Sequence, residues 1–173
     1  MDNRLLTRRA ALSTLAALTA LAAAPGVAMA ASPAAGTRFR EIRVDVAPLR
    51  ANGSGEIADW IAAELPGLLR KSFAAYLAPD DRGAATLVAR VDQVFLGPSG
   101  SVDTNPVADT TDGIVGAGVV LGAGGQQLAS YPLSASVGAD TYLNQPYQLE
   151  ITHRRVDTLA QSFAQWLPGQ MGM

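Results

Sequence analysis

The densest group of side chains able to hold a ligand lies between residues 97 and 113. Asp103, Asn105, Asp109 and Asp112 fall within ten residues there, and no basic residue accompanies them. Carboxylate and amide oxygens suit calcium, and the first three match positions one, three and seven of an EF-hand loop. The positions where that motif needs another oxygen ligand, a glycine and a glutamate hold Val107, Ala108 and Ile114. We therefore predict no metal site, and interpret Asp103, Asp109 and Asp112 as a candidate partner-binding loop kept open by charge repulsion.

A glycine-rich run, Gly116-Ala-Gly118-Val-Val-Leu-Gly122, has the composition of a dinucleotide-binding loop. Its spacing does not fit, because the fingerprint places two residues between its second and third glycines and here there are three. The motif also needs a strand before it and a helix after it, whereas a loop and a turn are expected here. We predict no nucleotide and no other cofactor, and expect these glycines to let another element approach closely.

Residues for nucleophilic or general-base catalysis are few. His153 is the single histidine, and a general base needs a partner, for which Asp157 lies one helical turn further on. Ser130, Ser134 and Ser136 lack the Gly-x-Ser-x-Gly pattern of a nucleophile elbow. The chain has no cysteine, which excludes disulfides, thiol catalysis and cysteine-ligated metals. We predict that the protein is not an enzyme, and that His153 lies on the surface or pairs two helices.

The first thirty residues have the layout of a bacterial signal peptide. Arg4, Arg8 and Arg9 precede a charge-free stretch from 10 to 24, and Ala28 and Ala30 occupy positions −3 and −1 of a predicted cut after Ala30. No cysteine follows, so attachment of a lipid anchor at a lipoprotein cleavage site is excluded. We expect a periplasmic or secreted protein.

The arginine pair suggests a particular export route. Arg8-Arg9, preceded by Thr7 and followed by Leu12, resembles a twin-arginine signal, although Ser13 stands where a lysine is usual. The general secretory route and an uncleaved membrane anchor remain alternatives.

Charge narrows the set of partners. The chain has 13 basic and 15 acidic residues; residues 1–30 hold three arginines and one aspartate, which leaves 10 basic and 14 acidic residues and a net charge of −4. Such a surface is not suited to nucleic acid.

After a flexible stub at 31–36, no repeat, charge run or linker interrupts residues 37–173, which we predict to form one domain.

Hydrophobic periodicity predicts the elements that position these residues. Period-two alternation indicates a strand at 41–46, and apolar residues three and four apart indicate a helix over 54–77, with Pro66 kinking or dividing it. A strand at 86–96, a hairpin of 114–121 with 128–137, and a helix over 146–167 stopped by Pro168-Gly169 follow. The order β-α-β-β-β-α predicts an α+β two-layer sandwich, a four-stranded, mostly antiparallel sheet with both helices on one face. The first two strands are expected to be parallel, with the position of the first left open.

The predicted core joins the two layers. We expect Leu65, Leu68, Leu159 and Phe163 to pack on Val44, Val91 and Leu133, with Trp60 and Trp166 also inside.

This order of elements resembles that of the ABC-type transport auxiliary lipoproteins and the outer-membrane assembly lipoproteins. The matching stretches are Arg43-Val-Asp-Val, the amphipathic 57–77, Ala85-Thr-Leu-Val-Ala-Arg-Val-Asp, the Gly122 hairpin and the final helix. Those families are anchored through a cysteine that this chain lacks. The resemblance implies a non-enzymatic accessory whose partner is another envelope component, protein or lipid.

Three functions follow, in order of preference. The first is an exported, non-enzymatic envelope accessory or binding protein. The second is a carrier of a lipid or small apolar ligand, for which Gly116 and Gly118 would leave room between sheet and helices. The third is a small hydrolase-type enzyme whose Asp, Tyr and Arg residues would come from the 103–112 loop, Tyr142, Tyr147 and the Arg154-Arg155 pair.

Overall fold

The sheet runs in the order β1-β2-β3-β4 in the computed structural model, which describes residues 37–97, 111–138 and 148–173. β1 pairs in parallel with β2, and the other two pairings are antiparallel. The elements are β1 (Phe39–Asp45), α1 (Ala47–Ala51), α2 (Gly55–Ser72), the short 3₁₀ helix η1 (Ala74–Tyr76), β2 (Ala85–Phe95), β3 (Thr111–Leu121), β4 (Gln127–Gly138) and α3 (Gln148–Gln170). The predicted α+β fold and its element order are confirmed, and β1 lies at an edge of the sheet.

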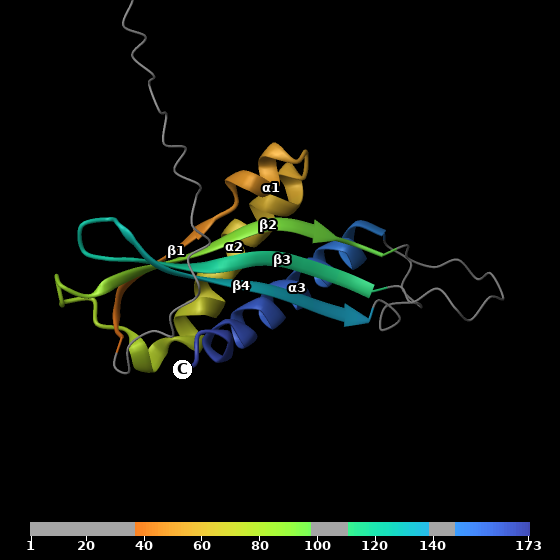
Figure 1. Ribbon diagram of the computed structural model, residues 1–173. Coiled ribbons are helices and arrows are strands. Elements are labelled where there is room, and N and C mark those ends of the chain that lie inside the picture. The colour runs from red at the N-terminus through yellow and green to blue at the C-terminus, as the bar shows by residue number, and fades with distance from the viewer. Residues whose placement is uncertain (1–36, 98–110, 139–147) are drawn as a thin grey trace, which may run out of the picture.

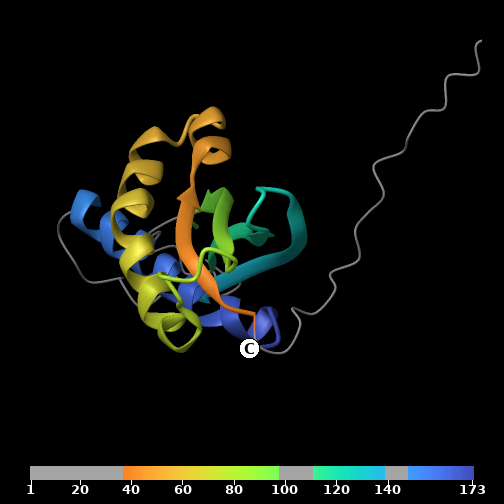
Figure 2. The same ribbon diagram turned by 90° about the vertical axis from the view of Figure 1, so that its left-hand side faces the viewer.

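The long helices form the second layer. Figure 1 shows the sheet in front with α2 and α3 behind it, and Figure 2 shows both helices on the same side of the strands. α2 packs near β1, whereas α3 packs against β3 and β4, and the two helices contact each other. Each helix turns its apolar face to the sheet, as the spacing of three and four predicts.

α2 is one helix, although Pro66 lies inside it. A proline removes one backbone donor and crowds the preceding turn. Packing of Ala58, Ile61, Leu65 and Leu69, all buried, stabilises the helix on both sides of that position. The helix stops at Ser72, and η1 completes the segment that was expected to be helical to 77.

α3 continues beyond Pro168-Gly169, so the predicted stop there is wrong. The helix ends at Gln170, and Gly172, two residues further on, has a φ of 76°, the left-handed conformation that glycine adopts without strain. Gly172 N–H donates to the carbonyl of Gly169, and Met173 N–H donates to the carbonyl of Pro168, each at 3.0 Å. These two bonds are those of a Schellman motif, which satisfies the last carbonyls of the helix.

The core is filled where the two layers meet. Leu65, Leu159, Phe163 and Val91 are fully buried as predicted and Leu133 nearly so, whereas Leu68 and Val44 are only partly buried. The prediction for Trp166 is wrong, since 46% of its surface is exposed, while Trp60 packs against the core in part.

Gly116 and Gly118 face α3, and close packing there explains the glycines. A Cβ on Gly118 would lie 2.8 Å from Leu167 Cδ1, and one on Gly116 would lie 2.0 Å from the Arg90 carbonyl oxygen and 3.2 Å from Phe163. Leu167 and Phe163 therefore occupy the space above these glycines. The expected close approach is confirmed, and the space proposed for a carried ligand is taken by the protein's own side chains.

Candidate binding cleft beside β1

Asp112 is not part of an open acidic loop. β3 begins at Thr111, three residues earlier than expected, and this places Asp112 in the sheet with a side chain only 2% exposed. No basic residue lies near Asp112 in the sequence, but in the folded structure Arg155 of α3 lies against it and compensates its charge. Asp103 and Asp109 lie outside the described residues, so the rest of the loop prediction stays a prediction.

Arg155 joins three elements through this contact. Its Nε donates to Asp112 Oδ2 at 2.7 Å, and its Nη2 donates to Asp112 Oδ1 and to the carbonyl oxygen of Gly97, the latter at 2.6 Å. Gly97 N–H donates back to Asp112 Oδ1 at 2.9 Å. The planar guanidinium meets the carboxylate as a fork, which neutralises both charges and saturates the carboxylate. This cluster fixes the end of β2 to the start of β3. Its charged groups bond to one another and to Gly97, so we assign them a structural role.

His153 pairs two helices. Its ring meets that of Trp60 from α2 edge to face, with centroids 4.9 Å apart. Asp157 Oδ1 lies 3.7 Å from His153 Nε2, too far for a hydrogen bond, and no described residue donates a hydrogen bond to that buried oxygen. The expectation that His153 pairs helices is therefore confirmed by its contact with Trp60.

The remaining predicted residues are spread widely. Ser130, Ser134 and Ser136 lie along β4, whereas Arg8, Arg9, Ala28, Ala30, Tyr142 and Tyr147 lie outside the described residues. Across residues 37–97, 111–138 and 148–173, no group of three or more His, Cys, Asp or Glu side chains is placed to hold a metal ion. Nor does any helix in those ranges have the length and apolar character needed to cross a membrane.

The two edge strands of the sheet, β1 and β4, differ in how readily they could pair with a further strand. β4 carries Pro132 in its middle, and a proline on an edge strand discourages further pairing because it has no N–H to donate. β1 contains no proline. Near its start, its outer side is covered by a bridge between Phe39 and Leu77, where Ala78 N–H donates to the Phe39 carbonyl at 2.8 Å. From Ile42 onward, no described strand pairs with that side.

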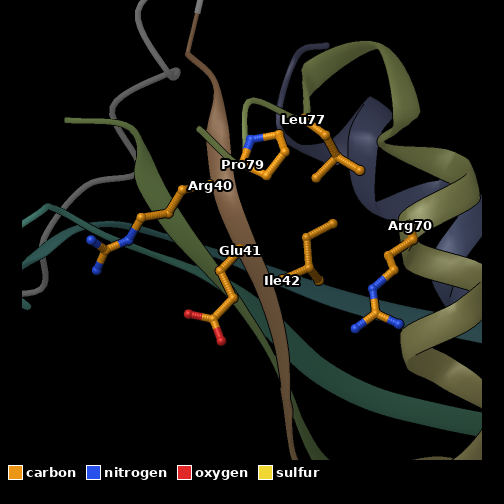
Figure 3. A pocket seen from close by; sticks show the side chains of 6 residues that line it. All are labelled: Arg40, Glu41, Ile42, Arg70, Leu77 and Pro79. Atoms are coloured by element: carbon orange, nitrogen blue, oxygen red, sulfur yellow. The ribbon is translucent and has the colours of Figure 1, made fainter. Parts of the chain in front are cut away.

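A cleft of about 220 Å³ lies beside this open edge, between β1 and the end of α2. Its lining combines apolar and charged side chains, namely Arg40, Glu41, Ile42, Arg70, Leu77 and Pro79. Figure 3 shows Arg70 reaching from α2 toward Ile42 on β1, with Leu77 and Pro79 above them and Arg40 and Glu41 on the other side of the strand. An apolar floor and charged margins suit a peptide better than a purely polar ligand.

The basic residues without an ion pair gather around this cleft. Within the described residues, the arginines at 43, 50, 90, 154 and 155 each contact a carboxylate. The five that contact none there are Arg38, Arg40, Arg70, Lys71 and Arg82. All five belong to segments that meet where β1 and β2 begin and α2 ends. The acids of the same segments are Asp80, Asp81 and Glu41, and Glu41 is paired with Arg43, so cations outnumber acids at this end of an otherwise acidic protein.

Two details show how the charges near the cleft are held. Arg43 donates a hydrogen bond to Glu41 at 2.7 Å, and this bond lowers the pKa of Glu41 below its ordinary value while it raises the pKa of Arg43. The negative charge of Glu41 is therefore offset by Arg43. Arg40 Nε donates to the hydroxyl of buried Thr86 at 3.3 Å, which directs that guanidinium across β2. Arg70 has no such partner within the described residues.

Sequence reasoning missed this cleft because its members are far apart in the chain. Arg70 and Lys71 lie in the last turn of α2, where the helix dipole favours cations whether or not a site is present. The one available signal was the row of arginines at 38, 40 and 43 in a chain whose net charge is negative.

No protein-family model matches this chain, and no curated protein matches its sequence. Among solved structures, it is similar to a minor lipoprotein of Acinetobacter baumannii, with 15% identity and a TM-score of 0.39 over 76% of this chain and 94% of that one. It is also similar to a PelC dodecamer of Paraburkholderia phytofirmans, with 12% identity and a TM-score of 0.45 over 82% and 94%. An uncharacterized lipoprotein B of Nitrosomonas europaea gives 8% identity and a TM-score of 0.32 over 73% and 81%. Both identity and TM-score are low, so function has to be inferred from this chain's own surface.

Proposed function

We propose that this chain is an exported, non-enzymatic envelope accessory protein that binds another envelope component at the cleft beside β1. The observation that carries the proposal is the coincidence of three features at one place. An unpaired sheet edge, a cleft with an apolar floor and two arginines that have no ion pair in the described residues, Arg40 and Arg70, meet between β1 and α2. The signal-peptide pattern of residues 1–30 supports an envelope location.

The interior weighs against the carrier alternative. A carrier that held an apolar ligand between sheet and helices would need space there. Phe163 and Leu167 are fully buried and lie against Gly116 and Gly118, where such space was expected. The described surface cleft, by contrast, is open to a partner without any rearrangement of the core.

Affinity capture tests the proposal. The mature protein, beginning at Ala31, is immobilised and exposed to envelope extracts, and both proteins and lipids that bind are identified by mass spectrometry. Arg70→Glu reverses the one cleft charge that has no partner among the described residues, and Arg154→Glu makes the same reversal on α3, outside the cleft. We expect a component captured by the wild type and by Arg154→Glu but lost with Arg70→Glu. Equal capture by all three proteins would contradict a partner site at this cleft.

A further inference from the structure

We infer that the cleft binds an acidic, extended peptide segment of a partner protein, which adds to the sheet as a fifth strand beside β1. This inference rests on the proposed function and specifies the chemistry of its partner. Strand addition uses main-chain hydrogen bonds for affinity and the side chains along the edge for selection. Each part of the inference has its own structural support.

The backbone of β1 supplies the main-chain contacts. β1 is bonded to β2 on one side, and on the other side the described backbone bonds only near Phe39, through Leu77 and Ala78. Edge strands present a row of N–H and C=O groups able to pair with another chain. At the opposite edge, Pro132 of β4 discourages pairing with a further strand, whereas β1 contains no proline. Of the two edges of this sheet, β1 is therefore the one suited to strand addition.

The charged side chains around the cleft favour an acidic peptide segment. Arg40 and Arg70 line the cleft from β1 and α2, and Arg38 borders a neighbouring open hollow of about 320 Å³ that Asp81 also lines. The carboxylate of Glu41 is held by Arg43, so it offers little repulsion to an incoming acid. Side chains of an added strand point alternately to the two faces of the sheet. Acidic residues of such a strand that point toward α2 can thus meet Arg70, while apolar residues on the same face reach Ile42 and Leu77.

The probe is a synthetic peptide about eight residues long, a common strand length, in which pairs of valines and pairs of glutamates alternate, so that both residue types point to each face of the sheet. A fluorescent label reports binding by anisotropy, and hydrogen exchange reports protection of amides in β1. We expect binding that weakens with salt, and added protection between Ile42 and Asp45. Arg70→Glu should weaken binding at least about tenfold, the effect of losing one contact of about 1.4 kcal/mol. Arg40→Gln should weaken it less, because that guanidinium is directed toward β2, and Arg154→Glu should leave it unchanged.

Altered peptides separate charge from strand pairing. A peptide with lysine in place of glutamate keeps the backbone but reverses the charge, and we expect it not to bind. Two further peptides keep the charge but carry N-methyl groups on alternate amides, one on the odd and one on the even residues. Because only alternate amides of an added strand face β1, one of these two peptides should fail to bind. Binding of the lysine peptide, or full binding of both N-methylated registers, would overturn the inference.

Other sources of negative charge are tested in parallel. Phosphatidylglycerol vesicles and inorganic phosphate are offered to the same proteins. Binding to either one that depends on Arg70, without binding of the valine–glutamate peptide, would overturn strand addition in favour of an anionic headgroup or ion. The capture experiment remains independent of this result. An envelope component lost with Arg70→Glu would still support the proposed site even where the acidic peptide fails.

Discussion

Arg155 on α3 and Asp112 on β3 form a buried, forked ion pair, with side chains 4% and 2% exposed. The pair also holds Gly97 through two hydrogen bonds, so one guanidinium and one carboxylate fasten the end of β2 and the start of β3 to the helix layer. A carboxylate that sequence reasoning assigned to a partner-binding loop thus serves the fold. Its replacement should therefore change the stability of the protein.

Arg155→Met tests this role. The substitution leaves Asp112 buried and charged without its partner, and removing one member of such a pair costs about 3–5 kcal/mol of unfolding free energy. Urea unfolding monitored by circular dichroism measures that cost. Arg154→Met is the matched control, because its neighbouring ion pair with Glu150 is exposed and should contribute less than about 1 kcal/mol. Similar losses for the two variants would show that the buried pair is not a main support of the fold.

The glycines of β3 should tolerate substitution in a definite order. A Cβ on Gly116 would collide with the backbone oxygen of Arg90, whereas one on Gly118 would meet the end of the Leu167 side chain. A side chain can shift more easily than a strand, so Gly116→Ala should lose more stability than Gly118→Ala, by an overpacking cost of about 1–3 kcal/mol or more.

Gly67→Ala provides the control for these variants. Gly67 lies inside α2 with nothing within 4 Å of its would-be Cβ. Alanine is favoured over glycine in a helix by about 0.5–1 kcal/mol, so this change should stabilise the protein. Thermal unfolding of the three variants gives their order directly. Equal tolerance at Gly116 and Gly67 would show that α3 and β2 do not hold β3 as closely as described.

Local periodicity sufficed to predict the fold class. Alternation along β1 and the spacing of apolar residues in α2 each fix an element and the face it buries. The prediction at Pro168 was wrong because a helix can continue past a proline when packing and capping stabilise its last turn. Here the Schellman motif at Gly172 supplies the cap. Trp166 was misplaced because a broad apolar stripe does not show which of its margins faces solvent.

The candidate site could not be predicted from periodicity, because it is formed by contacts between residues that are far apart in the sequence. Asp112 and Arg155 are 43 residues apart, and only the packing of α3 on β3 brings them together. The cleft likewise needs β1 at the edge of the sheet, which the sequence left open. The predicted order and partial parallel pairing were compatible with β1 at more than one position, and pairing of β1 on both sides would have removed the cleft.

Leu65 and Leu68 test the apolar face of α2 more finely. Leu65 is fully buried, whereas Leu68 is only partly buried at the margin of the core. Leu65→Ala should cost about 2–5 kcal/mol of unfolding free energy, while Leu68→Ala should cost clearly less. Denaturant unfolding of both variants under the same conditions makes the comparison. A larger loss at Leu68 would mean that α2 is rotated relative to the sheet.

Export depends on residues outside the described part and follows from the sequence alone. Replacing Arg8 and Arg9 together by lysine keeps the basic charge but removes the twin-arginine pattern. We expect the variant to stay in the cytoplasm, as cell fractionation would show, and the exported wild type to begin at Ala31 in N-terminal sequencing. Normal export of the lysine variant would favour the general secretory route. An intact leader on the exported protein would favour the anchor.

The ion pair of Glu41 and Arg43 predicts a pH effect at the edge of β1. The hydrogen bond from Arg43 lowers the pKa of Glu41, so the pair's small stabilising contribution is present above the carboxyl's unfolded pKa and is lost as the pH falls through its folded pKa. In a carbon-detected NMR titration, Glu41 should therefore titrate below its ordinary range. Arg43→Gln removes the donor and should return the pKa of Glu41 toward its ordinary value, whereas Arg50→Gln, which alters an exposed pair with Asp59, should leave it unchanged. A Glu41 carboxyl that titrates alike in all three proteins would show that Arg43 does not hold it in solution, and would leave its charge facing any acidic partner at the cleft.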